Sequence, residues 1–329
     1  MAQAIIDGHP LHYFPNGFPL LIAGIMLITP DNVPVILVLL NIIMQITSLI
    51  LMEKILSRYN IEEKTRLVII FILAVYPHQR DTVRLILTES HAMFLIILSF
   101  FLYSNKKYMA SGFAGYLSYT FRPTLFFVIP LIIIYDFFKG KKIPALKSAA
   151  GFLTGLLLFV ILDVTGVVDS PDNYESNLLV AINSYGHDID FKLEESSEYE
   201  IRHPVKSYFN FILNNPVEYT KQRFLSLWCL WGPVIYDDYS FDTLVTYSIR
   251  FPFFILAMLA FIFRNKIEYN RDLLILMSFP VISVTFIHFF FFSIPRHPAV
   301  AEPFVIVMSI LFLDYLIKIR KKSKVVSVV

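Results

Sequence analysis

Long apolar runs constrain the fold of this chain more than any other feature. Residues 33–52, 143–168 and 273–292 are almost uninterrupted apolar stretches, and about 20 such residues cross the hydrocarbon core of a bilayer as a helix. Hydrophobic residues make up 56% of the sequence and charged residues only 16%, against roughly 25% charged in a soluble domain. The sequence therefore predicts an all-α, polytopic transmembrane bundle that forms one domain over residues 1–329.

We expect nine membrane spans, or ten if a short segment near the N-terminus also crosses. Their expected limits are 33–56, 67–77, 85–103, 108–121, 123–138, 144–168, 244–263, 272–292 and 299–317. The single cysteine, Cys229, excludes an internal disulfide framework, so helix packing must hold the fold together.

The connections between these spans fall into two alternating classes. The class that is rich in lysine and arginine comprises residues 54–66, 104–107, 139–147, 264–271 and the tail after 318. Basic connections remain in the cytoplasm by the positive-inside rule, so this side and the C-terminus are expected to be cytoplasmic. The opposite class, expected outside, comprises residues 77–84, the corner at Arg122, the long segment 169–243 and the turn 293–298.

The short outer connections carry arginine and no lysine. Their arginines are Arg80, Arg84, Arg122 and Arg296. A guanidinium group binds phosphate oxygens through two parallel hydrogen bonds and stays charged in a site of low dielectric constant. The alternative is that these arginines pair with Asp81, Glu89 or Glu302, or extend their charged ends to the membrane interface.

The segment 17–28 is bracketed by prolines and is too short to span a bilayer upright. At 1.5 Å per residue it reaches roughly 18 Å, against a hydrocarbon core of about 30 Å. We expect it to lie at the outer interface or to dip into the membrane without crossing it. Nine spans with a cytoplasmic C-terminus would place Met1 outside, so we favour the hypothesis that the sequence begins after a first span and that Met1 is an internal methionine.

Several short motifs occur in a fixed order along the chain. They are AQAIIDG at 2–8, PNGFPLLIA at 15–23, TES at 88–90, FRP at 121–123 with Pro130, NPxxY at 215–219 with Trp228, and PRHPAVAEPF at 295–304. This ordered set resembles the membrane-embedded C-type glycosyltransferases, especially bacterial relatives of the dolichyl-phosphate-mannose protein mannosyltransferases. His297 and Ala299 depart from the tyrosine and arginine that are usual in the family, and Asn16 stands where a second proline is frequent.

The resemblance implies an enzyme of the bacterial plasma membrane that works at its outer face. It would transfer a hexosyl or pentosyl group from a polyprenyl-phosphate donor to a glycan, lipid or protein acceptor. Such a transfer needs a carboxylate to accept the hydroxyl proton and cations to stabilise the departing phosphate. The resemblance implies no nucleic acid partner. No cofactor is expected, since no metal-ligand spacing such as HExxH is found, although a divalent metal is compatible with the reaction.

The resemblance also selects site residues. The family's catalytic acid lies a few residues before the A-to-G element, which would fall upstream of Met1, and leaves Asp7 and Glu89 as candidates within the chain. Asp7 is also compatible with an Asp-Gly turn, and Glu89 with a packing contact between helices. The candidates for binding the donor phosphate or the sugars are Arg80, Arg84, Arg122, Arg296, Glu302, His9, His12, Tyr13 and Asn16.

Two other functions remain open. A polymerase or ligase of lipid-linked polysaccharide would also use outer arginines, but it would need a central outer loop rich in arginine, whereas segment 169–243 is more acidic than basic. A transporter or flippase would carry polar residues at mid-membrane in several spans, with broken helices there; Asn41, Gln45 and Asp163 keep this alternative open. Within the outer segment, residues 208–231 have apolar positions at helical spacing and predict an interfacial helix.

Overall fold

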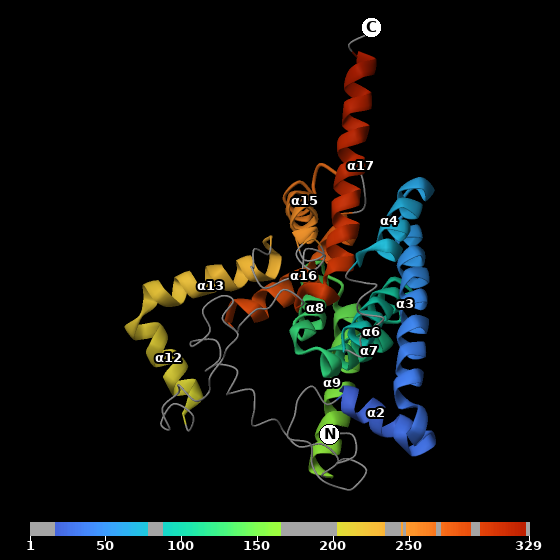
Figure 1. Ribbon diagram of the computed structural model, residues 1–329. Helices are drawn as coiled ribbons and strands as arrows, with labels where there is room; N and C mark the ends of the chain where they lie inside the picture. Colours follow the sequence, from blue (N-terminus) through green and yellow to red (C-terminus); the bar gives the residue numbers. More distant parts are fainter. Residues whose placement is uncertain are drawn as a thin grey trace.

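The computed structural model describes residues 17–77, 88–165, 203–233, 245, 248–267, 271–290 and 297–326 (Figure 1). These residues form helices joined by turns and contain no strand, so the all-α prediction is confirmed. The elements are α2 (Gly17–Ile28), η1 (Pro30–Asn32), α3 (Val33–Arg58), α4 (Glu63–Val75), α6 (Glu89–Ser104), α7 (Tyr108–Phe121), η2 (Pro123–Leu125), α8 (Val128–Phe138), α9 (Lys142–Val164), α12 (Pro204–Asn214), α13 (Pro216–Trp231), α15 (Arg250–Ile262), α16 (Arg271–Phe290), η4 (His297–Val300) and α17 (Glu302–Val326).

Each of the nine expected spans corresponds to one of the described helices, with shifted ends. Three helices are long and apolar enough to cross a membrane, within Pro30–Arg58, Lys142–Leu162 and Arg271–Phe290. Other apolar helices are shorter, including α6 and α15. The apolar side chains along one side of α3 point away from the protein, since Leu39, Ile43 and Ile50 are each at least half exposed. An exposed apolar stripe of this kind suits contact with lipid.

The helix ends gather at two opposite ends of the bundle. At the first, Arg58 Nη1 donates to the carbonyl oxygen of Ser104 at 3.2 Å, and Lys318 Nζ lies 2.6 Å from Glu62. We call this the lysine-rich end, because the connections 105–107, 139–141 and 263–266 lie there. At the other, α6, α15 and α17 begin and α7 ends, and we call it the arginine-bearing end. The side of a membrane that each end faces stays a prediction, and most of the expected outer connections lie outside the described residues.

Helix α2 does not run along the bundle. A Cβ atom on Gly17 would come within 2.7 Å of Thr120 Oγ1 and within 3.0 Å of the Phe121 ring, so α2 begins beside the last turn of α7. Its other end leads through η1 into α3, which starts at the same end of the bundle. Figure 1 shows α2 lying across the foot of α3, as expected for a segment too short to span.

Glycines bring α7 and α9 into backbone contact. A Cβ atom on Gly112 would lie 2.0 Å from the carbonyl oxygen of Ser148, and one on Gly151 would lie 1.9 Å from that of Met109. Both distances are shorter than any van der Waals contact, so neither position accepts a side chain. Small residues at such contacts allow helices to pack closely where lipid gives no hydrophobic drive for association.

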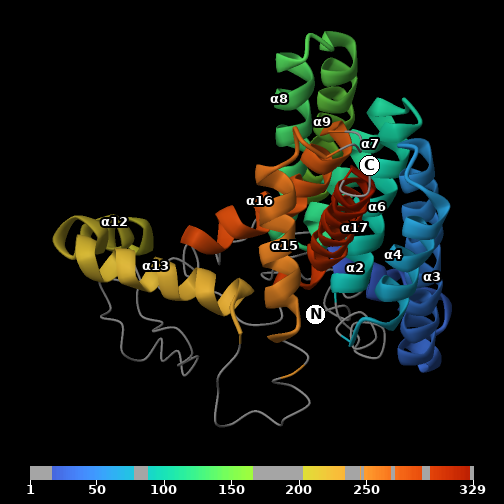
Figure 2. The same cartoon turned by 90° about the horizontal axis from the view of Figure 1, so that it is seen from above.

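Helices α12 and α13 form an arm that projects from the side of the bundle (Figures 1 and 2). The arm carries exposed apolar side chains at helical spacing, with Phe209 and Leu213 on α12 and Phe224 and Trp228 on α13. The C-terminal end of α13 packs against α16, where Trp231 Nε1 donates to Thr285 Oγ1 at 3.0 Å. The helical part of the prediction for residues 208–231 is confirmed, with a break at Asn215.

Candidate functional site

An ion pair joins the corner after α7 to the first turn of α6. Arg122 Nη2 lies 2.7 Å from Glu89 Oε1, and the side chains are 17% and 4% exposed. Arg122 precedes Pro123, which disfavours the helical conformation at the preceding residue, and its φ and ψ of −144° and 102° are extended. This extended residue ends α7, and its side chain reaches back to the start of α6. Both Arg122 and Glu89 were candidates from the sequence, and the structure joins them in the carboxylate pairing that was the alternative to phosphate binding by Arg122.

The start of α2 lies beside this pair. The imidazole of His91, two residues after Glu89, stacks on the Phe121 ring with centroids 5.4 Å apart and planes inclined by 5°. The Phe18 ring meets the same imidazole edge-on, also at 5.4 Å. Helix α2, which contains Phe18, therefore begins at the corner that holds Arg122.

A second ion pair is buried between the starts of α15 and α17. Arg250 Nη1 lies 3.9 Å from Glu302 Oε1, and the side chains are 1% and 2% exposed. Arg250 Nη2 also donates to the carbonyl oxygen of Cys229 at 3.0 Å. Glu302 was a sequence candidate, but Arg250 was missed because it begins an apolar stretch and was counted as part of a span. The signal was available, since a charged residue at the edge of an apolar helix requires a partner.

Tyr76, at the end of α4, lies near the second pair, and sequence reasoning also missed it. Its side chain is 3% exposed and its ring meets Phe253 edge-on with centroids 6.2 Å apart. Among the residues that the structure describes, its hydroxyl has no hydrogen-bond partner. A buried hydroxyl without a hydrogen-bond partner lowers the free energy of unfolding by about 1–3 kcal/mol, so the Tyr76 hydroxyl reduces the stability of the bundle.

The arm is attached through the last carbonyl groups of α16. Arg223 Nη1 donates to the carbonyl oxygen of Phe289 at 3.3 Å, and its guanidinium group lies 5.2 Å from the centre of the Tyr219 ring. Tyr208 donates its hydroxyl to the carbonyl oxygen of Phe290 at 2.9 Å. Burial lowers the pKa of the Arg223 guanidinium, while the hydroxyls of Tyr208 and Tyr219 oppose the shift. A cation at this place also complements the negative end of the α16 dipole.

The His288 ring, near the end of α16, stacks on that of His297 with centroids 4.4 Å apart and planes inclined by 21°. His297 belongs to η4, which leads directly to Glu302. The motif at 295–304 is therefore packed against the end of α16.

Most of the other sequence candidates lie outside the described residues. These are Arg80, Arg84, Arg296, Asp7, His9, His12, Tyr13 and Asn16. The convergence of the four outer arginines on one phosphate thus stays a prediction. Of the described candidates, Glu302 is joined to Arg250 rather than to Arg122.

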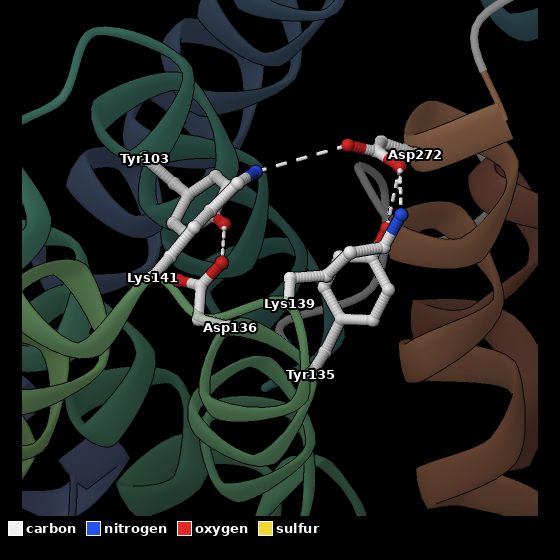
Figure 3. Close-up of polar contacts among 6 residues, drawn as sticks. All are labelled: Tyr103, Tyr135, Asp136, Lys139, Lys141 and Asp272. Atoms are coloured by element: carbon white, nitrogen blue, oxygen red, sulfur yellow. Dashed lines mark hydrogen bonds and ion pairs between the residues drawn. The ribbon is translucent and has the colours of Figure 1, made fainter.

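The lysine-rich end holds a second polar cluster, formed by Tyr103, Tyr135, Asp136, Lys139, Lys141 and Asp272 (Figure 3). It was not a candidate from the sequence, because its residues come from three parts of the chain: the end of α6, the end of α8 with the turn after it, and the start of α16. Tyr59, which follows α3, lies near its carboxylates. Burial, followed by the negative charges of Asp272 and Asp136, raises the pKa of Tyr59 to about 12.

Two further findings bear on what the chain can bind. The described residues include no group of three or more His, Cys, Asp or Glu side chains placed to hold a metal ion. A cavity with room for about one water molecule lies between α3, α4 and α6 and is lined by Gln45, Ser48 and Pro303 among others.

Comparison of the chain with protein-family models, with curated proteins and with solved structures gave no match. The resemblance to C-type glycosyltransferases is therefore carried by the short sequence motifs alone.

Proposed function

We propose that this chain is an integral membrane glycosyltransferase, which moves a sugar from a polyprenyl-phosphate donor to an acceptor at the outer face of the membrane. The lysine-rich end would lie in the cytoplasm and the arginine-bearing end outside. Three helices of sufficient length and apolar character support the membrane location. The ordered motifs support the type of reaction.

The observation that carries the proposal is the ion pair of Arg122 and Glu89. The carboxylate of Glu89 holds the guanidinium group in one orientation at the corner between two helices. A guanidinium group has five N–H donors, so it is able to bind a carboxylate and a phosphate oxygen together. In this proposal Arg122 binds the donor phosphate and Glu89 is a positioning residue. The charge of Arg122 would stabilise the negative charge that develops on the departing phosphate.

The experiment that tests this proposal is donor consumption by the purified chain in vesicles. The donor is a polyprenyl-phosphate sugar, and the release of polyprenyl phosphate is measured. Arg122→Lys should lower the rate at least tenfold while the protein stays folded, since an ammonium group cannot reproduce the bidentate guanidinium contact with a phosphate. Arg264→Lys is the matched control, because Arg264 lies at the lysine-rich end and, within the described residues, donates to the carbonyl oxygen of Phe261 three residues before it. Equal rates for both variants would refute the role of Arg122.

A transporter is a second candidate, favoured by polar residues at the middle of α3. Asn41 is fully buried and Ser48 is 2% exposed, and Gln45 lies between them on the same helical face. Among the three described helices that are long and apolar enough to cross a membrane, α16 contains Pro280 and the stretch Pro30–Arg58 divides into η1 and α3; transporters often bind their substrates at breaks in helices. Substrate accumulation in sealed vesicles without sugar transfer would favour the transporter.

A further inference from the structure

The turn between α8 and α9 carries two lysines that share one carboxylate. Lys139 Nζ lies 3.4 Å from Asp272 Oδ1, and Lys141 Nζ lies 3.8 Å from Asp272 Oδ2. Gly140 separates the lysines and has a φ of 73°, in the left-handed region that glycine adopts readily. The lysine side chains are 40% and 47% exposed, and Figure 3 shows both ammonium groups directed at Asp272.

Tyrosine hydroxyls fix the carboxylates of this cluster. Tyr135 donates to Asp272 Oδ1 at 2.6 Å, and Tyr103 donates to the fully buried Asp136 at 2.6 Å. Figure 3 shows the Lys141 side chain extending over Tyr103 and Asp136 toward Asp272. A basic group whose acidic partners are themselves anchored is held in position for a ligand.

The cluster carries more positive than negative charge at its surface. Lys142 and Arg271 are exposed and adjoin Lys141 and Asp272 in sequence, and Asp272 is a partly buried carboxylate of the described part of this cluster. Lys142 begins α9 and Arg271 begins α16. The first turn of a helix has free N–H groups and the positive end of the helix dipole, so basic residues there are unfavourable unless an anion is near. The first turn of α16 carries the acidic Asp272, whereas the first turn of α9 carries no acidic residue and thus provides donors for an anion.

Apolar side chains lie directly beside the basic groups. Phe138 is 85% exposed, Ile143 is 67% exposed and Leu146 is 69% exposed. These residues precede and follow the lysine turn in sequence, on the last turn of α8 and the first turns of α9. A soluble phosphate compound would gain no binding free energy from this apolar surface, whereas the acyl chains of a lipid would cover it.

We propose that the α8–α9 turn is a binding site for an anionic phospholipid of the leaflet at the lysine-rich end. The phosphate lies between Lys139 and Lys141, near the starts of α9 and α16, and the acyl chains run along Phe138, Ile143 and Leu146. This inference rests on the membrane location given under Proposed function, and it does not depend on sugar transfer.

The test is native mass spectrometry of the full chain, released from nanodiscs that contain phosphatidylglycerol and phosphatidylcholine. The wild type should retain phosphatidylglycerol in preference to phosphatidylcholine. Lys139→Gln/Lys141→Gln should weaken this retention about 30-fold, since each basic residue near an anionic surface contributes about a fivefold factor. The matched control is Lys106→Gln/Lys107→Gln, which removes the same charge from exposed positions at the same end and should retain the lipid.

Three results of this experiment would overturn the proposed lipid site. Equal losses of lipid retention in the two double variants would mean that retention depends only on the total charge of the lysine-rich end. Displacement of phosphatidylglycerol by millimolar inorganic phosphate would mean that the site binds phosphate without regard to acyl chains. Phe138→Gln, which keeps both lysines, should also weaken lipid retention. Unchanged retention in this variant would contradict the proposed contact between Phe138 and an acyl chain. A wild type that does not enter nanodiscs would overturn the membrane location itself, whereas loss of sugar transfer with intact lipid retention would affect only the enzyme proposal.

Discussion

Arg122 Nη2 lies 2.7 Å from Glu89 Oε1, although 33 residues separate the two in sequence. The contact fixes the corner after α7 against the first turn of α6, and Glu89 is 4% exposed. Removing one partner of a buried ion pair leaves a charge without compensation, which costs about 3–5 kcal/mol. The pair is therefore expected to matter for stability as well as for the proposed phosphate contact.

Replacing Glu89 should destabilise the protein far more than replacing an exposed carboxylate of similar geometry. We expect Glu89→Ala to cost about 3 kcal/mol or more. The matched control is Glu62→Ala, whose partner Lys318 lies at 2.6 Å while the Glu62 side chain is 60% exposed; it should cost at most about 1 kcal/mol. Unfolding in mixed micelles measures both. Similar losses for the two variants would contradict the burial of the Glu89 carboxylate.

Side chains added at the α7–α9 contact should separate the helices. Gly112→Ala and Gly151→Ala place a methyl group against backbone carbonyl groups, and overpacking of this kind costs about 1–3 kcal/mol. Gly24→Ala is the control, because a Cβ atom on Gly24 would meet nothing within 4 Å. It should be neutral or stabilise α2 by about 0.5–1 kcal/mol. Melting temperatures in detergent measure these effects. A Gly112→Ala variant that melts at the wild-type temperature would contradict the close packing of α7 against α9.

Two tyrosines should respond in opposite directions to loss of the hydroxyl. Tyr76→Phe removes a buried hydroxyl without a hydrogen-bond partner among the described residues, so the melting temperature should be unchanged or higher. Tyr103→Phe removes the 2.6 Å donor to Asp136 and leaves a buried carboxylate oxygen unsatisfied, at a cost of about 1–3 kcal/mol. If Tyr76→Phe were the more damaging change, the hydroxyl of Tyr76 would have a partner that the bundle requires.

Cysteine labelling should establish the orientation. Cys229 is 3% exposed and can be replaced by serine to give a silent background. An impermeant thiol reagent applied to sealed cells should label cysteines introduced at 172–199 and leave Lys141→Cys unlabelled, because basic connections stay inside. Outside labelling of Lys141→Cys would reverse the orientation, and the proposed lipid site would then face the opposite leaflet.

The helices could be predicted from the sequence because apolar runs and their flanking charges are local features. The expected span 108–121 coincides with α7, and 17–28 coincides with α2. The expected span 123–138 includes η2, since the helix α8 starts only at Val128. In this region Pro123 and Pro130 disturb the regular hydrogen bonding of a helix.

Contacts at the candidate site could be predicted from the sequence only where both residues were charged and lay at the ends of apolar runs. Arg122 and Glu89 were noticed because each is a charge at the end of an apolar run. The partner of Glu302 was not noticed, because Arg250 is 52 residues away and no local sequence pattern connects the two residues. Tyr135 and Asp272 meet across 137 residues, a pairing that only the packing of α8 against α16 creates.

The most direct test of the account is the affinity of the purified chain for polyprenyl phosphate, measured in nanodiscs without any acceptor. This measurement does not depend on the catalytic acid, so it isolates the phosphate contact assigned to Arg122. We expect the wild type to bind, Arg122→Lys to bind at least about tenfold more weakly, and Arg264→Lys to bind like the wild type, since a hydrogen bond to a charged group contributes about 1.5–3 kcal/mol. A wild type that does not bind polyprenyl phosphate, or an Arg122→Lys variant that binds equally well, would contradict the account.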